Sequence, residues 1–223
     1  MDSMPGVWCP LPGPRMSAIL ALASGRQRAH QPAVMLFALP CCSRVLPRRF
    51  GVDGMAIGES IGALAEAVRE NDPDRAVDLL QAGGEHLELV SGEDPTPRLR
   101  ELLLPHALGL MSSAERGDAD AALATLEQQR LLCAHREGPY GVEHWNRQVE
   151  RWISEESGQP LWTSTYPGRP LLVTANDYGL GIYNGDTGVI VRRGSGLRAA
   201  VASTNGRLDL APSRLGQVET MHA

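Results

Sequence analysis

Residues 169–191 decide the fold and read R-P-L-L-V-T-A-N-D-Y-G-L-G-I-Y-N-G-D-T-G-V-I-V. A short apolar run stands near each end of this stretch, at 171–173 and 189–191. The second run is rich in β-branched residues, which favour a pleated, half-buried strand. Between the runs, Asn184-Gly185 is a strong hairpin signal, because both residues tolerate a positive φ. On local physics alone, the stretch predicts an ordinary β-hairpin.

The residues after this hairpin predict more short strands. They lie at 198–203 and 207–210 and turn at Asn205-Gly206. Several short strands at this spacing favour a small β-barrel. We therefore expect a barrel within 161–215 that closes on itself.

The residues before the hairpin alternate between helical and extended patterns. Ile61, Leu64, Ala65 and Val68 recur at helical spacing, and Asn71-Asp72-Pro73 ends that helix. Further helices are predicted at 74–80, 98–111 and 121–129, the last capped by Asp118, and a strand at 86–90. The apolar run at 131–134 predicts a buried parallel strand. A helix follows, with Val142, Trp145, Val149 and Trp152 along one face.

The first 45 residues carry scattered prolines and no sustained period. Only residues 16–24 could form a short helix. A segment without a periodic apolar face cannot offset the entropy of ordering, so this segment is expected to be disordered.

The charge composition limits the possible chemistry. The chain of 223 residues has a formal net charge of -5 and contains no lysine, since every basic residue is arginine. A P-loop requires a lysine on the β- and γ-phosphates. These residues therefore cannot form a complete P-loop ATPase, and the acidic balance argues mildly against a free-standing nucleic-acid binder.

The cysteines and histidines show no metal-site spacing. Cys9, Cys41, Cys42 and Cys133 contain no C-x-x-C pair. Reduced thiols in a cytoplasmic protein are expected, with no bound metal. No apolar run approaches the roughly 20 residues of a membrane span, so no membrane contact is expected.

Three segments in a fixed order resemble a known family. They are R-R-F-G at 48–51, L-L-C-A-H-R-E-G-P-Y-G-V-E-H-W-N at 131–146, and the G-R-P, N-D-Y and Y-N-G-D-T-G groups within 168–188. The likeness continues through A-P-S-R-L at 211–215 to the final E-T-M-H-A. The chain resembles the RecD-type superfamily-one DNA helicases, the alpha subunit of exodeoxyribonuclease V.

The resemblance implies an α/β fold. Residues 46–160 would form an incomplete RecA-like second motor lobe with a parallel sheet. Residues 161–215 would form an inserted SH3-like β-barrel, and 216–223 would return to the motor lobe. Residues 1–45 match nothing in the family. The implied parent function is ATP-driven unwinding of DNA ends, within a helicase–nuclease complex for double-strand-break repair and recombination.

The resemblance also implies site residues. Arg49 would reach the ATP γ-phosphate, with ATP and Mg²⁺ bound only by the intact family protein. Arg136 and Asn146 are the candidates for contacts with DNA, because a strand that leads into a helix N-terminus suits a phosphate. The alternative is that Arg136 is a solvated strand-end residue and that Asn146 caps or packs locally. Trp145 and Trp152 are interpreted as core residues, because they follow the apolar stripe.

Two functional hypotheses remain open. The chain is a piece of a RecD-like motor that works with DNA and the other subunits of exodeoxyribonuclease V once another polypeptide supplies the missing parts. Alternatively, it is a truncated, catalytically inactive product that at most binds DNA or those subunits. The missing P-loop and the missing H-K-S-Q-G coupling loop of the family favour the second hypothesis for the isolated chain.

Overall fold

The computed structural model describes most of the chain. The described residues are 17–23, 33–38, 59–84, 87–92, 94–133, 135–161, 163–204 and 206–223. Arg49, predicted to reach the ATP γ-phosphate, lies outside them, as do Cys9, Cys41 and Cys42.

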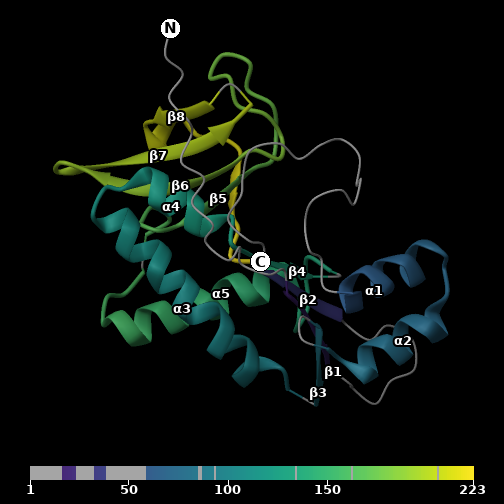
Figure 1. Cartoon of the computed structure of the whole chain (residues 1–223). Helices are drawn as coiled ribbons and strands as arrows, with labels where there is room; N and C mark the ends of the chain where they lie inside the picture. Colours follow the sequence, from purple (N-terminus) through teal and green to yellow (C-terminus); the bar gives the residue numbers. More distant parts are fainter. Residues whose placement is uncertain are drawn as a thin grey trace, which may run out of the picture.

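A four-stranded mixed sheet occupies one side of the molecule (Figure 1). In spatial order its strands are β3 (Leu87–Gly92), β1 (Ser17–Ala23), β2 (Ala33–Ala38) and β4 (Gln129–Cys133). Only the β1–β3 pair is parallel, whereas β1–β2 and β2–β4 are antiparallel. The prediction of a parallel sheet, with a parallel strand at 131–134, was therefore wrong. The partner of β4 is β2, which runs in the opposite direction.

The strands β1 and β2 also correct the expectation for residues 1–45. Residues 17–23 form a strand, not the short helix considered for 16–24. Pairing with β2 and β3 on its two sides overrides the helix propensity of this alanine- and leucine-rich segment. The prediction of disorder fails for 17–23 and 33–38, and the other residues of that segment lie outside the described ones.

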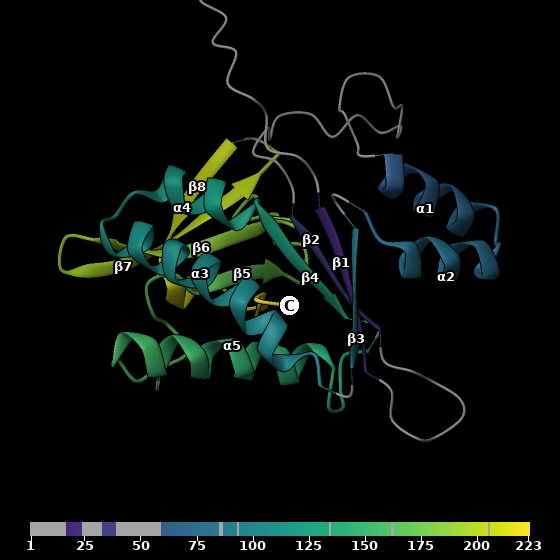
Figure 2. The same cartoon turned by 60° about the horizontal axis from the view of Figure 1, so that its bottom comes forward.

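Helices cover both faces of this mixed sheet (Figure 2). On one side lie α1 (Glu59–Arg69) and α2 (Pro73–Ala82), and on the other lie α3 (Thr96–Glu115) and α5 (Val142–Ser157). The short helix α4 (Ala119–Leu126) lies against the second sheet, described below. The predicted cap is confirmed, since the Asp118 carboxylate accepts a hydrogen bond of 3.0 Å from the Ala121 amide. Trp145 and Trp152 are 0% and 2% exposed and pack against α3 and β4, as predicted for core residues.

The second sheet is antiparallel and carries the predicted hairpin. In spatial order its strands are β8 (Gly206–Leu210), β7 (Gly196–Ser203), β6 (Thr187–Arg193), β5 (Pro170–Val173) and β9 (Val218–Thr220). The register Pro170↔Val189 confirms the hairpin. β9 was not predicted. It pairs with β5, so residues 218–220, within the segment 216–223 that was expected to return to a motor lobe, extend this sheet.

The second sheet does not close on itself in its strand pairing, because β8 and β9 are its two edges. One of its faces shares a core with α3 and α4, where Leu110 and Leu126 pack with Val189 and Val191. The other face forms a separate cluster around Leu171, Ile190 and Val201. The sheet and the helical part are therefore joined by a common hydrophobic core and are not independent units.

Gly168 marks a close approach between these two parts. Its φ is +86°, and a Cβ atom built there would lie 2.5 Å from the Met111 Cα on α3. Real Cβ atoms do not approach another carbon so closely, so only glycine fits. The chain thus enters the second sheet directly against α3.

Candidate nucleic-acid interface

The loop 135–141 connects β4 to α5 and was the predicted phosphate site. Gly141 is the N-cap of α5, and a Cβ atom there would lie 2.5 Å from the Glu137 carbonyl oxygen. The loop folds back on the helix, because the amides of Val142 and Glu143 donate to the carbonyls of His135 and Arg136 at 3.1 Å each. These first-turn amides are the groups that would hold an anion, and the loop itself occupies them.

Arg136 extends from this loop to the surface. Its side chain is 71% exposed and forms an ion pair with Glu219 of β9. An exposed pair of this kind contributes about 0–1 kcal/mol. The Arg136 guanidinium can therefore leave Glu219 and bind another anion with little loss of free energy.

The side chain of Asn146 forms hydrogen bonds with the last residues of the chain. Its Nδ2 donates to the Thr220 carbonyl at 2.9 Å, and its Oδ1 accepts from the amides of His222 and Ala223 at 2.8 and 3.0 Å. Both predicted nucleic-acid residues thus contact the segment 219–223. The Arg136 side chain remains accessible to solvent, whereas the polar atoms of the Asn146 side chain are already bonded to the C-terminal residues.

A chain of polar side chains also fixes this segment. The Tyr166 hydroxyl donates to the Glu150 carboxylate at 3.0 Å, so it accepts from the His222 Nε2–H, also at 3.0 Å. Burial lowers the pKa of His222 to about 3, and the charges of His106 and Arg169 act in the same direction. Burial and the Glu150 charge raise the pKa of Tyr166. At neutral pH His222 is therefore an uncharged donor inside the protein.

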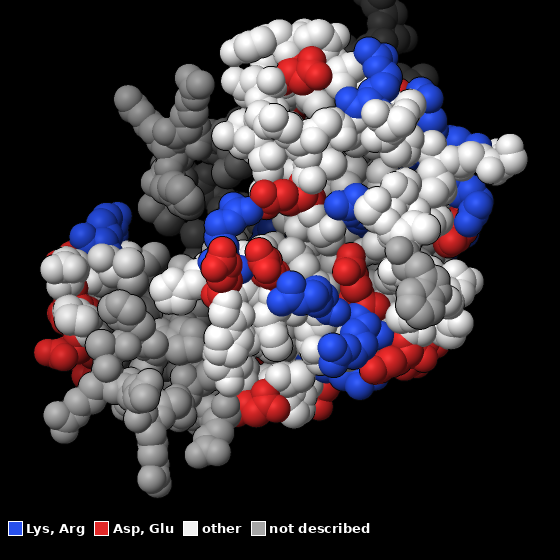
Figure 3. Space-filling view, turned by 180° about the vertical axis from the view of Figure 1, so that it is seen from behind, with Lys and Arg blue, Asp and Glu red and all other residues white. Residues whose placement is uncertain are grey.

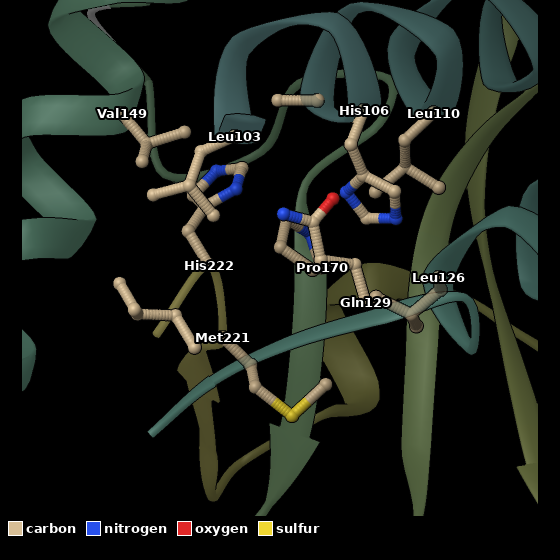
Figure 4. Close-up of a pocket in the computed structure, with 11 residues that line it drawn as sticks. Leu103, His106, Leu110, Leu126, Gln129, Val149, Pro170, Met221 and His222 are labelled. Carbon is tan, nitrogen blue, oxygen red and sulfur yellow. The ribbon is translucent and has the colours of Figure 1, made fainter. Parts of the chain in front are cut away.

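A small cavity of about 20 Å³ lies beside His222. Figure 4 shows the rings of His106 and His222 at its wall, together with Met221 and Leu110. His106 donates from Nε2 to the Thr125 carbonyl at 2.7 Å, and burial lowers its pKa. The volume accommodates about one water molecule, so the cavity is not a nucleotide site.

The described part of the chain contains neither a cluster of metal-ligating side chains nor a membrane-spanning helix. No group of three or more His, Cys, Asp or Glu side chains is arranged there to hold a metal ion. Burial raises the pKa of the Cys133 thiol to about 11, which disfavours the thiolate that a metal requires. Among the same residues, no helix is long and apolar enough to cross a bilayer.

The surface seen from behind mixes charges of both signs (Figure 3). Ion pairs such as Arg98–Glu88 at 2.8 Å and Arg100–Glu155 at 3.5 Å neutralise many of the arginines. Phosphates bind best to a continuous basic stripe, whereas over most of this face the arginines alternate with acidic side chains.

Sequence reasoning missed the polar contacts that hold the C-terminal segment. Glu150, Tyr166 and His222 come together although 56 residues separate the last two along the chain. A single histidine near one end of a sequence carries no local signal of such a partner. Tyr166 and His222 come close only because β9 pairs with β5.

Comparison with known proteins supplies the family. No protein-family profile matches the chain. RecBCD enzyme subunit RecD of Mycobacterium tuberculosis strain H37Rv is 60% identical over 166 residues, which is 74% of this chain and 29% of that protein. The subunit of the same name from Mycolicibacterium smegmatis is 59% identical over the same shares. Over these 166 residues the chain is similar to RecD subunits. The resemblance to the alpha subunit of exodeoxyribonuclease V is thereby confirmed.

The likeness to RecD extends to a distant relative. RecBCD enzyme subunit RecD of Haemophilus influenzae is 31% identical over 80 residues, which is 34% of this chain and 12% of that protein. In every case the chain spans less than a third of the RecD relative that it matches. What these larger proteins do as a whole is therefore not assigned to this chain by identity alone.

Proposed function

We propose that this chain forms part of a RecD-type subunit that acts on DNA within a helicase–nuclease complex for double-strand-break repair. The identity of 60% over 166 residues with a RecBCD subunit carries this proposal. The proposed partners are DNA and the other subunits of such a complex, and the proposed location is the cytoplasm.

The proposed structural role follows the same relationship. Residues 46–160 correspond to part of a RecA-like second motor lobe, and 161–215 to an SH3-like unit. The helices on both faces of the mixed sheet and the short antiparallel strands that follow support this assignment. The antiparallel pairing of β4 and the open second sheet depart from the regular forms of those folds.

ATP chemistry would depend on residues outside this chain. The 223 residues contain no lysine, so the P-loop that binds the β- and γ-phosphates is not among them. Arg49 is proposed to reach the γ-phosphate when ATP and Mg²⁺ are held by that other part. The purified chain should show no DNA-stimulated ATPase in a coupled assay. Turnover that disappears in Arg49→Ala would contradict this proposal.

Co-expression with the other subunits of a mycobacterial RecBCD complex tests the proposed partnership. We expect the chain to co-elute with them in size-exclusion chromatography, and elution at its own mass in every mixture would refute the assignment. Binding of a fluorescent oligonucleotide tests the DNA contact. Arg136→Gln should weaken it and reduce its salt dependence by about one phosphate contact. Arg147→Gln, which breaks an exposed pair with Glu143 on α5, is the matched control.

The second candidate function is that of an inactive product that only binds DNA or the former partner subunits. The lysine-free composition favours it for the isolated chain. Co-elution or DNA binding without any ATP-dependent unwinding, even after a lobe with a P-loop is added, would support this candidate over the first.

A further inference from the structure

The strand β4 carries two side chains on the side of the mixed sheet that faces away from α3 and α5. Successive side chains of a strand point to opposite faces. Leu131 packs in the core with α3 and α5, and the Gln129 Nε2 donates to the Leu102 carbonyl of α3 at 3.4 Å. Arg130 and Leu132 therefore point to the opposite side of the sheet, which is the side of α1 and α2.

The helices described on that side do not cover β4. α1 and α2 pack in a cluster of their own with Leu87 of β3, and Figure 2 shows both helices beside β3 and β1. In the strand order β3 and β4 are the two edges of the mixed sheet, so they lie about 14 Å apart. Leu132 is accordingly 50% exposed, whereas Leu131, on the covered side of the same strand, is 3% exposed.

Arg130 is half-buried and has no counter-ion. Its guanidinium forms no hydrogen bond and no ion pair with any residue that the structure describes. Burial lowers the pKa of Arg130, and the charge of Glu127 opposes this effect without an ion pair between the two side chains. On the other side of the sheet, by contrast, Arg98 pairs with Glu88 at 2.8 Å and with Glu101 at 2.9 Å. A half-buried charge without a partner is unfavourable, so Arg130 does not stabilise the isolated chain.

These two side chains define the chemistry of a partner. A carboxylate would neutralise the Arg130 guanidinium in a charge-assisted hydrogen bond, and an apolar side chain would cover Leu132. The two groups would be about 7 Å apart, which is the spacing of alternate residues along a strand. A protein surface can present both groups at that spacing. The phosphate backbone of a nucleic acid fits less well, because it offers nothing to Leu132 and because β4 contains no second basic residue.

We propose that Arg130 and Leu132 form a docking surface for another subunit of the helicase–nuclease complex, which supplies a carboxylate to Arg130 and an apolar side chain to Leu132. This inference rests on the proposed function, because it names the residues by which the chain would contact a partner subunit. Arginine is common among the residues that dominate the affinity of protein interfaces. Its truncation leaves the opposing carboxylate unpaired, so the loss of affinity is large.

Biolayer interferometry tests the proposal, with the full chain immobilised and the co-purified other subunits of a mycobacterial RecBCD complex in solution. Arg130→Met should weaken binding by about 30-fold or more, and Arg130→Lys, which keeps the charge, should lose less. Leu132→Thr, which keeps the strand propensity, should weaken binding by about 5- to 10-fold. Arg151→Met is the matched control and should bind as the unchanged chain does, because it removes an exposed arginine of α5 on the other side of the sheet.

The melting temperature of the isolated variant separates a docking role from a structural one. Arg130→Met removes a charge that has no partner among the described residues, so its melting temperature should equal or exceed that of the unchanged chain. A lower melting temperature would show that Arg130 supports the fold and would count against the proposal.

The binding data distinguish this inference from the proposed function. Unchanged subunit binding by either Arg130→Met or Leu132→Thr overturns the inference and leaves the proposed partnership intact. If the unchanged chain binds none of the subunits, both fail. Loss of oligonucleotide binding in place of subunit binding would make this surface a nucleic-acid contact, and a change in the mass of the chain alone in size-exclusion chromatography would make it a contact between two copies. In either case the inference is wrong.

Discussion

Acidification should destabilise the protein through His222. In the folded protein the pKa of His222 is lowered to about 3, whereas an unfolded histidine titrates near its ordinary value of 6.5. Above pH 6.5 the side chain is neutral in both states and adds no pH dependence. As the pH falls from 6.5 towards 3, only the unfolded state takes up the proton, so stability is lost across that window. At pH 5 the loss from this one group is about 2 kcal/mol.

The variant His222→Gln isolates this effect. A glutamine amide can still donate to the Tyr166 hydroxyl but has no proton to bind between pH 7.5 and 5. Urea unfolding, followed by the fluorescence of buried Trp145 and Trp152, gives the free energy of unfolding at both pH values. The decrease on acidification should be about 2 kcal/mol smaller in the variant. His106, whose pKa is lowered too, contributes to both proteins. Equal decreases in the two proteins would refute the reasoning.

Three further substitutions test the packing. Asn146→Ala should cost about 1–3 kcal/mol, because it leaves partly buried backbone groups of the C-terminal segment unpaired. It should also speed hydrogen exchange at 218–223, whereas Arg147→Ala should change neither quantity. Gly168→Ala should cost at least about 2 kcal/mol in urea unfolding, since a positive φ and the contact with Met111 both oppose a Cβ. Leu110→Ala should cost about 2–5 kcal/mol and weaken amide protection in β6 as well as in α3, and a loss confined to α3 would argue against a shared core.

Local chemistry was predictable from the sequence. The Asp118 cap, the end of α1 before Asn71-Asp72-Pro73 and the hairpin of β5 with β6 each depend on neighbouring residues, and the structure contains all three. The buried stripe of α5 was predictable for the same reason, because its spacing places the apolar residues on one face.

The arrangement of the strands was not predictable from local chemistry. The apolar run at 131–134 suits a buried strand in either direction, and the direction of β4 depends on its pairing with β2, almost a hundred residues earlier. The same holds for the candidate site. The partners of Asn146 lie 74 to 77 residues later, and no pattern around Asn146 indicates them.

The core that β6 shares with α3 and α4 has a consequence for how this family can be divided into parts. A polypeptide cut out at residue 163 would expose Val189, Val191 and Ala200, which are fully buried here. Such a piece would have no cover for one side of its sheet and would tend to associate with other molecules. Exchange of the second sheet between related proteins should therefore succeed only when α3 and α4 are exchanged together with it. Residues 96–223 contain all of these elements.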